Sequence, residues 1–204
     1  MTGRGLDWRA FVRTWQAVIA VWLAYAAVRL ALQPLLGWEP VDPDDWARLL
    51  QVRAWLDGQP FWDVTQYRMN PPQGFSMHWS RLVDLPLAAL MLLFGETAAM
   101  ALVPLLWLLA ALFALRGIML RLNFPPLAFG LLILPLFPML PATFAPMRID
   151  HHAPQAVLAL VCAALLIQNS RLSAIACGLC AAAWMVISLE GLPLVAVLAA
   201  LYGV

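Results

Sequence analysis

The segment APMRIDHHAPQ, residues 145–155, places an arginine, an aspartate and two adjacent histidines between long apolar runs. Carboxylates favour hard divalent cations such as Mg²⁺ or Mn²⁺, and an added imidazole shifts the preference toward Mn²⁺ without excluding Mg²⁺. Asp150 and His152 are two residues apart, so both side chains turn the same way if the segment is extended, whereas His151 turns away. His152 is therefore the better candidate ligand, and His151 the better candidate for supporting contacts around the site.

A second acidic group, Asp42, Asp44 and Asp45, lies in an earlier polar segment, and oxygen ligands from both segments could close on one divalent cation. The structural alternative is a pair of solvated turns, because the Asp42–Asp45 run also suits the N-terminus of a helix. Arg148 would pair with Asp150 in that alternative and contact an anionic substrate in the functional one. The spacing alone leaves both interpretations open.

Three further residues could take part in binding or catalysis. Arg68 and Arg81 lie beside aromatic residues, where arginine either contacts phosphate or anchors against lipid headgroups; we favour phosphate contact for Arg68 and anchoring for Arg81. Glu190 stands between Leu189 and Gly191 at the end of an apolar run, where a carboxylate is costly unless it faces a polar cavity. We therefore predict a functional role for Glu190.

The elements that must position these residues are membrane helices. Hydrophobic residues make up 64% of the chain, charged residues 11%, and the mean hydropathy is +0.83, values typical of an integral membrane protein. All twelve basic residues are arginine, and the net charge of +1 gives no indication of a nucleic-acid partner. The placement of charge is therefore more informative than its total.

A spanning helix needs about 20 mostly apolar residues, which allows the spans to be counted. The block 85–115 is interrupted by Gly95-Glu96, which predicts a short membrane-embedded or interfacial helix followed by a span from about Thr97 to Arg116 and Arg121. The remaining predicted spans are 11–32, about 125–140, 153–168, 172–189 and a last apolar piece from 192 onward. The fold class is thus an all-α polytopic membrane bundle with five to six spans.

Arginines predict the orientation of this bundle. Arg4 and Arg9 before the first run and Arg13 at its start place the N-terminus in the cytoplasm of a multi-pass inner (plasma) membrane protein. Arg116, Arg121 and Arg171 then fall on the same side. The polar segments 33–84 and 142–152 both become extracytoplasmic loops. Within the first, we expect a helix from about Asp44 to Leu56 along the membrane surface, followed by an irregular stretch.

The first loop, opening with DPDDWARLLQVRAWL and followed by PP, and the second loop, with RIDHH before a span, resemble the N-terminal part of the GT-C membrane glycosyltransferases, especially oligosaccharyltransferase catalytic subunits. Members carry an acidic residue in an Asp-x-Trp/Tyr context in the first loop and an Asp-x-His type motif in the second. The resemblance implies metal ligands at Asp44, Asp150 and His152, with Asp44 or Asp45 as the first-loop counterpart.

The resemblance also implies a function. A sugar or oligosaccharide would pass from a polyprenyl-phosphate-type donor to an acceptor on the extracytoplasmic face, with Mn²⁺ or Mg²⁺ as cofactor and membrane lipid as surroundings. The implied catalytic residues are Asp44, Asp45, Asp150 and Glu190, and the implied substrate-binding residues are Arg68, Arg148 and His151. Asp42, Asp45 and Glu190 would position or activate the acceptor.

Two features limit what the resemblance implies. The family's Trp-Trp-Asp motif has no match, which leaves protein, lipid and glycan acceptors open. We also expect the chain to be one transmembrane domain from the N-terminal part of a longer protein.

The alternative function is that of a non-catalytic transporter or assembly subunit, in which ionisable residues serve ion coupling. Transporters tend to place such residues near mid-membrane, often in two related halves, whereas here the acids cluster in outer loops and no repeat is visible. We therefore favour the enzyme.

Overall fold

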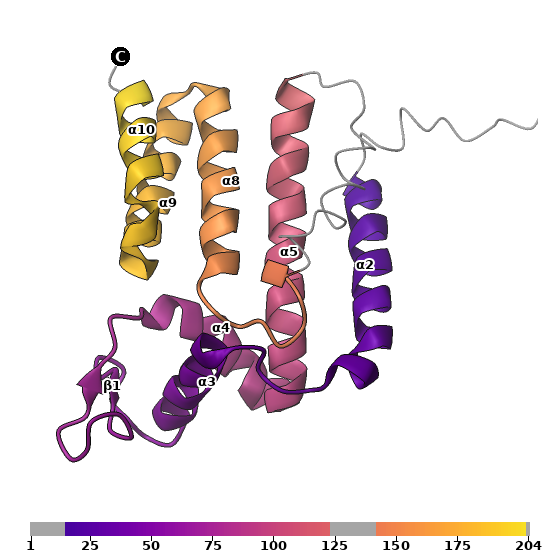
Figure 1. Ribbon diagram of the computed structural model, residues 1–204. Helices are drawn as coiled ribbons and strands as arrows, with labels where there is room; N and C mark the ends of the chain where they lie inside the picture. The colour runs from indigo at the N-terminus through magenta and orange to yellow at the C-terminus, as the bar shows by residue number, and fades with distance from the viewer. Residues whose placement is uncertain (1–14, 123–141, 203–204) are drawn as a thin grey trace, which may run out of the picture.

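A computed structural model describes residues 15–122 and 142–202 of the chain. Those residues are mostly helical, and five helices run side by side as a bundle, with the remaining elements gathered at one end (Figure 1). The bundle helices are α2 (Trp15–Leu36), α5 (Glu96–Arg121), α8 (His152–Gln168), α9 (Arg171–Ile187) and α10 (Leu192–Tyr202). Helix α5 packs against both α2 and α8, so it forms the centre of the bundle.

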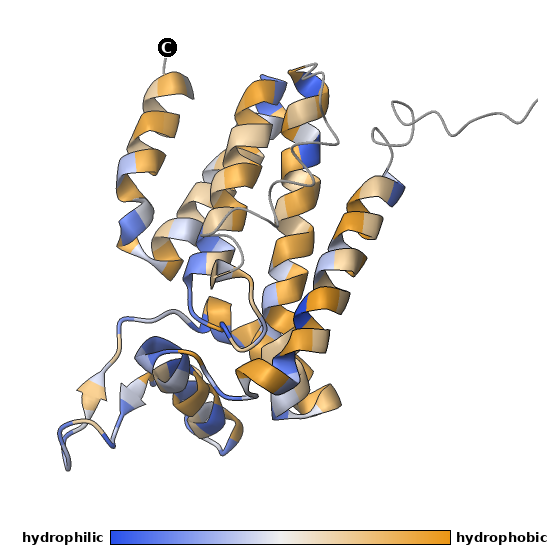
Figure 2. Ribbon diagram, turned by 45° about the vertical axis from the view of Figure 1, so that its right-hand side comes forward, coloured by the Kyte–Doolittle hydropathy of each residue, from blue (hydrophilic) through white to orange (hydrophobic). Residues whose placement is uncertain are grey.

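Two of the described helices, α2 and α5, are long and apolar enough to cross a membrane. Helices α8 and α9 are also apolar but have 17 residues each, which is short for a straight span. Hydrophobic residues cover most of the bundle, and hydrophilic residues concentrate in the elements at its end (Figure 2). The predicted span at 125–140 and the N-terminal arginines Arg4, Arg9 and Arg13 lie outside the described residues.

The helix predicted in the first loop is present as α3 (Pro43–Leu56), beginning one residue earlier than expected. Asp42 is its N-cap, with its side chain accepting from the backbone of Asp45, whose side chain accepts in turn from the Asp42 backbone. On this helix Leu49 is buried and Trp46 is 40% exposed. The buried face also carries polar side chains, which form an ion pair and a hydrogen bond with the next helix.

That helix, α4 (Arg81–Phe94), lies against α3 through a buried polar network. Asp84 is fully buried and accepts hydrogen bonds from Arg48 Nη1 at 2.7 Å, Gln51 Nε2 at 2.7 Å and Arg81 Nη1 at 3.2 Å. Arg81 also donates to the carbonyl of Asp63 at 2.7 Å, which ties the first loop to α4. The expectation that Arg81 anchors against lipid headgroups was wrong, because its side chain is buried and hydrogen-bonded inside the protein.

The interruption predicted at Gly95-Glu96 is confirmed. Helix α4 ends at Phe94 and α5 begins at Glu96, with Gly95 between them at φ +83°, a left-handed conformation that glycine adopts without strain. Glu96 then pairs with Arg53 of α3 through two hydrogen bonds of 2.6 Å. The break therefore turns the chain from the end of the bundle into its central helix.

The stretch expected to be irregular contains a short antiparallel hairpin. Strands β1 (Thr65–Gln66) and β2 (Phe75–Ser76) pair in the register Thr65 with Ser76 and Gln66 with Phe75. Two-residue strands give no alternation that a sequence pattern could reveal, which explains the missed prediction. Arg68 lies exposed in the connection between the strands.

Candidate metal centre between the two loops

The second loop is fixed to the central helix by a backbone hydrogen bond that a proline makes available. Pro104 lies inside α5 and has no N–H, so the carbonyl of Met100, one turn earlier, lacks its ordinary helical donor. The N–H of Met147 donates to this carbonyl at 3.0 Å. The second loop therefore contacts α5 at a defined point, three residues before Asp150.

Asp45 joins the first loop to the second. Its Oδ1 accepts hydrogen bonds from the backbone N–H groups of Ile149 at 2.8 Å and Asp150 at 3.0 Å, and the side chain is fully buried. Carboxylates that accept several N–H bonds form strong, directional contacts. Asp45 thus holds in place the backbone from which the second-loop side chains project.

Arg148 lies among three carboxylates. Its Nη1 donates to Asp42 and, at 3.0 Å, to Asp45, and its Nη2 donates to Asp150 at 2.7 Å. Of the two roles left open by the sequence, pairing with Asp150 is the one present here. One guanidinium cannot neutralise three carboxylates, so this group, Asp42, Asp45, Arg148 and Asp150, keeps an excess of negative charge.

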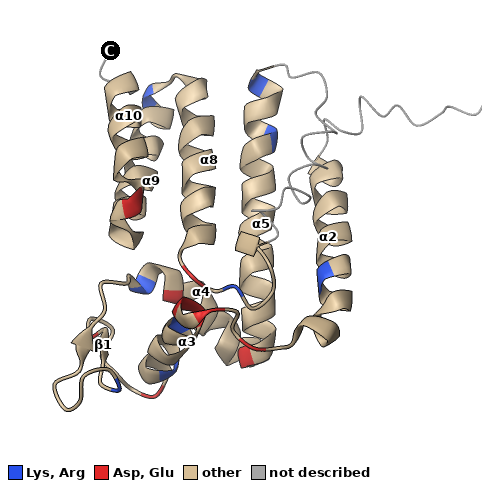
Figure 3. Cartoon of the chain, viewed as in Figure 1, with Lys and Arg blue, Asp and Glu red and all other residues tan. Residues whose placement is uncertain are grey.

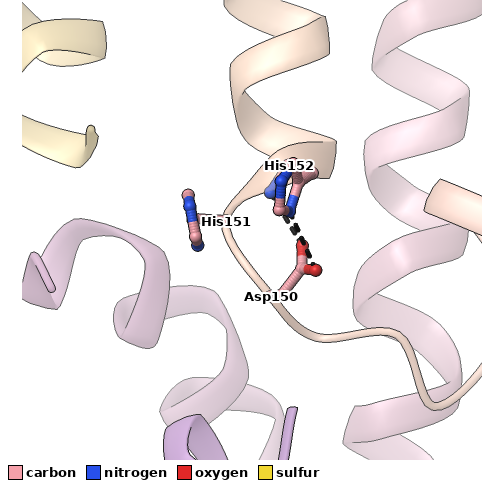
Figure 4. Close-up of side chains that lie close together, drawn as sticks. All are labelled: Asp150, His151 and His152. Carbon is pink, nitrogen blue, oxygen red and sulfur yellow. Dashed lines mark hydrogen bonds and ion pairs between the residues drawn. The ribbon is translucent and has the colours of Figure 1, made fainter. Parts of the chain in front are cut away.

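Asp150 and His152 face each other directly (Figure 4). His152 Nδ1 lies 2.9 Å from Asp150 Oδ2, and the His152 backbone N–H donates to Asp150 Oδ1 at 2.8 Å. Asp150 is 5% exposed, whereas the His152 side chain is 52% exposed. The pair therefore presents a buried anionic oxygen and an accessible imidazole nitrogen at the mouth of the loop.

His151 does not turn away as an extended segment would require. The chain is already entering α8, and His151 has φ −86° and ψ −4°, so the alternation of an extended strand does not apply. Its ring stacks on that of His152 with centroids 4.6 Å apart, and lies 6.0 Å from the Trp79 ring. Its Nδ1 is buried and has no hydrogen-bond partner among the described residues.

The ligand atoms of Asp150, His151 and His152 all lie within 4.8 Å of one another. A buried nitrogen with no partner, an accessible imidazole and a carboxylate in this space form a donor set that suits a divalent cation. We call Asp150, His151 and His152 the Asp-His-His cluster.

Glu190 approaches the same cluster from the other side of α8. Its Oε2 lies 3.6 Å from His151 Nε2 and accepts from Gln155 Nε2 at 2.9 Å, while Gln155 Oε1 accepts from Trp184 Nε1 at 2.9 Å. Glu190 lies in a short 3₁₀ helix, η2 (Leu189–Gly191), and a Cβ on Gly191 would clash with the Trp184 ring. Glycine is therefore needed for the close turn that presents Glu190.

Two predicted site residues lie apart from this cluster. Asp44 is exposed in the first turn of α3, and Asp45, one residue on, is the carboxylate that reaches the second loop. Arg68 makes no ion pair or hydrogen bond with any residue in the described ranges. Gln155 was not predicted, although its place four residues after His151, one turn along α8, is a signal that could have found it.

The protonation of the site favours cation binding at neutral pH. Burial raises the pKa of Asp45 to about 6, against the opposing effects of the Ile149 N–H and Arg148. Burial also acts to raise the pKa of Asp42, but hydrogen bonds, first that from Arg148, bring it below its usual value. Burial lowers the pKa of His151, and the hydrogen bond from Gln155 lowers the pKa of Glu190. Above pH 7 the carboxylates of Asp42, Asp45 and Glu190 are ionised and His151 is neutral, as a metal ligand must be.

Comparison of the chain with protein-family models, with curated proteins and with solved structures gives no match. The geometry of the site and the resemblance in the two loop motifs are therefore the indications of function.

Proposed function

We propose that this chain carries the metal centre of a GT-C-type glycosyltransferase, which moves a sugar or oligosaccharide from a polyprenyl-phosphate-type donor to an acceptor. The observation that carries the proposal is the Asp-His-His cluster, held by Asp45 and Arg148 at the junction of two loops. Both loops contain the motifs that resemble this family. The acceptor class stays open.

The donor atoms fit a hard or borderline divalent cation. Asp150 Oδ2 and His152 Nδ1 lie 2.9 Å apart, so a carboxylate oxygen and an imidazole nitrogen are close enough that both would contact one ion. These two residues would hold Mn²⁺ or Mg²⁺, with His151 as a third donor; Asp44 remains the ligand implied by resemblance. A bound ion would supply Lewis-acid stabilisation of the charge on the departing phosphate.

The chain's own residues divide the remaining work. Arg148 and the backbone N–H of His152 orient the Asp150 carboxylate, and Asp45 fixes the loop, a positioning role because its carboxylate is buried and fully hydrogen-bonded. Glu190 has a side chain that is 60% exposed and borders His151. It is the best-placed group to accept a proton from an acceptor hydroxyl or amide.

The proposed setting is a bundle of five to six spans in an inner membrane, with both loops on the extracytoplasmic face. In the described part of the chain, acidic residues gather around α3, α4 and the adjoining loops, whereas Arg116, Arg121 and Arg171 mark the opposite end of the bundle (Figure 3). This asymmetry suits a cytoplasmic opposite end. The donor phosphate would then meet the cluster at the outer face, with its lipid tail among the helices.

The experiment is a Mn²⁺ titration of the chain purified in detergent, followed by electron paramagnetic resonance. We expect one site in the wild type and at least about tenfold weaker binding in Asp150→Ala and in His152→Ala, because each removes a ligand. His78→Ala is the matched control, since it removes an exposed histidine outside the cluster. A short-chain polyprenyl-phosphate sugar should then bind more tightly with Mn²⁺ than with EDTA.

The second candidate is a non-catalytic membrane subunit in which the loop junction is only structural. The observation in its favour is that Arg148 already pairs with Asp42, Asp45 and Asp150. Mn²⁺ binding that is absent, or indifferent to both cluster substitutions, would favour this candidate.

A further inference from the structure

Arg29 is a charge inside an apolar helix that no acidic residue balances. It lies in α2, two turns before the helix ends at Leu36, and makes no ion pair or hydrogen bond with any residue in the described ranges. Its Nε is buried and has no hydrogen-bond partner within residues 15–122 and 142–202. The stretches outside those ranges contain one acid, Asp7, before the start of α2. Because an unbalanced charge in a membrane helix is costly, Arg29 calls for an anion from outside the chain.

A cavity of about 440 Å³ lies against Arg29, at the end of α2 nearest the two loops. Gln33, one turn after Arg29, also lines this cavity, and only 3% of its surface is exposed. The Gln33 Nε2 donates to the carbonyl of Gly37, while its Oε1 is buried with no partner among the described residues. Two residues that line the cavity thus each carry a polar atom unpaired among the described residues, Arg29 Nε and Gln33 Oε1, which points to a ligand with both an acceptor and a donor.

The charged residues that line the cavity carry both signs. Arg29 supplies a guanidinium that pairs with no carboxylate of the described residues. Glu39 and Arg148 also line the cavity, and the charge of Arg148 is already shared among Asp42, Asp45 and Asp150. The charge around Glu39 and Arg148 is therefore net negative. A ligand that fits must carry an anionic end toward Arg29 and a cationic, hydrogen-bond-donating end toward Glu39 and Gln33 Oε1.

We infer that this cavity binds the phosphoethanolamine headgroup of a membrane lipid, with the phosphate on Arg29 and the ammonium between Gln33 and Glu39. The position at the end of an apolar helix of spanning length is where lipid headgroups lie. The site adds a binding function beyond the proposed transfer reaction. It needs α2 to lie in a membrane and does not need the metal centre.

The test is native mass spectrometry of the full chain in detergent with an equimolar mixture of phosphatidylethanolamine and phosphatidylcholine of the same acyl chains. The two lipids differ at the headgroup nitrogen, and only the ethanolamine can donate hydrogen bonds. We expect one phosphatidylethanolamine per chain, and about tenfold less retention in Arg29→Gln, since a charge-assisted contact is lost. Arg171→Gln removes the same charge at the other end of the bundle and should retain the lipid.

A second variant tests the polarity of the site. Glu39→Gln should reduce the preference for phosphatidylethanolamine over phosphatidylcholine while phosphate binding by Arg29 remains. Equal retention of the two lipids by the wild type, or unchanged retention in Arg29→Gln, would overturn the inference. If soluble phosphoethanolamine binds as tightly as phosphatidylethanolamine, the ligand is the free headgroup molecule and not a membrane lipid. Mn²⁺ titration of Arg29→Gln tests the Asp-His-His cluster separately. A failure of the lipid site is therefore distinct from a failure of the proposed function.

Discussion

Two charged regions lie close together at the end of the bundle, and they differ in charge balance. Between α3 and α4, two guanidiniums, Arg48 and Arg81, surround the single carboxylate of Asp84. Between the loops, three carboxylates surround the single guanidinium of Arg148. The first group is buried and needs no further cation. The second group borders the exposed His152 and has an excess of negative charge.

The difference separates a structural network from a candidate binding site. Both groups contain the same residue types, so composition alone does not distinguish them. The arginine-rich network also stacks Arg48 over Trp79 and Arg81 over Trp55, which occupies the faces of both guanidiniums. The carboxylate-rich group instead adjoins His151, whose buried Nδ1 has no hydrogen-bond partner in the part of the chain that the structure describes.

The largest effect should come from breaking the structural network. Asp84→Ala leaves two buried guanidiniums without a carboxylate, and we expect the free energy of unfolding to fall by about 3–5 kcal/mol. Denaturant titration in detergent measures this loss. Asp57→Asn, at an exposed position just after α3, is the control and should change little. Near-wild-type stability in Asp84→Ala would mean that the network does not hold α3 against α4.

A smaller effect is expected from the carboxylate that ties the loops together. Asp45→Asn weakens the hydrogen bonds to Ile149, Asp150 and Arg148, and we expect about 2 kcal/mol of destabilisation together with weaker Mn²⁺ binding. Asp44→Asn is the matched neighbour. If Asp44 is the metal ligand that the resemblance implies, its substitution should weaken Mn²⁺ binding without the loss of stability.

The free energy of unfolding that Asp45 contributes should change by about 1 kcal/mol between pH 7 and pH 5. Burial raises the pKa of Asp45 to about 6, above its value in the unfolded chain. The stability from this group is therefore fully present below the unfolded pKa and is lost as pH rises through about 6. Wild type should gain stability relative to Asp45→Asn as pH falls from 7 to 5. The difference between the two proteins is needed because burial lowers the pKa of His151, which acts oppositely.

These pH measurements require EDTA, so that metal release does not mimic a proton effect. Denaturant titrations of both proteins at several pH values give the difference curve. A flat difference curve would contradict the assignment of this proton to Asp45.

The smallest effect concerns how the second loop is held on α5. Pro104→Ala restores an N–H that competes with Met147 for the carbonyl of Met100. We expect Mn²⁺ affinity to fall about threefold, since one net hydrogen bond is weakened, while α5 itself is not destabilised because alanine favours a helix. Val103→Ala, at the neighbouring position, controls for a change in packing. A parallel loss in both variants would attribute the effect to packing.

Local signals were enough to predict α3, the break at Gly95 and the two loop motifs. Each depends on neighbouring residues: the Asp42 cap, the glycine with positive φ, and the spacing of Asp150 and His152. The pairing of Arg48 with Asp84 spans 36 positions and has no local signal, so the sequence did not reveal it. The same applies to Arg81, whose aromatic neighbours suggested lipid contact.

The candidate site was predicted in its composition more than in its geometry. Asp150 and His152 lie together, and the roles of the predicted ligands and catalytic residues stay predictions. The orientation of His151 was missed because it depends on the point at which α8 begins. The choice between Asp44 and Asp45 could not be made from spacing, since it depends on which face of α3 meets the second loop.

The bond between Asp45 and the second loop has a consequence for biosynthesis. Its partners, Ile149 and Asp150, are 104 and 105 residues further along the chain. At 5–20 residues per second, a ribosome takes on the order of 5–20 s to add the intervening segment. Until then, Asp42 and Asp45 at the start of α3 lack their partner Arg148. The arginine-rich network, complete by residue 84, can already hold α3 in position to receive its late partner.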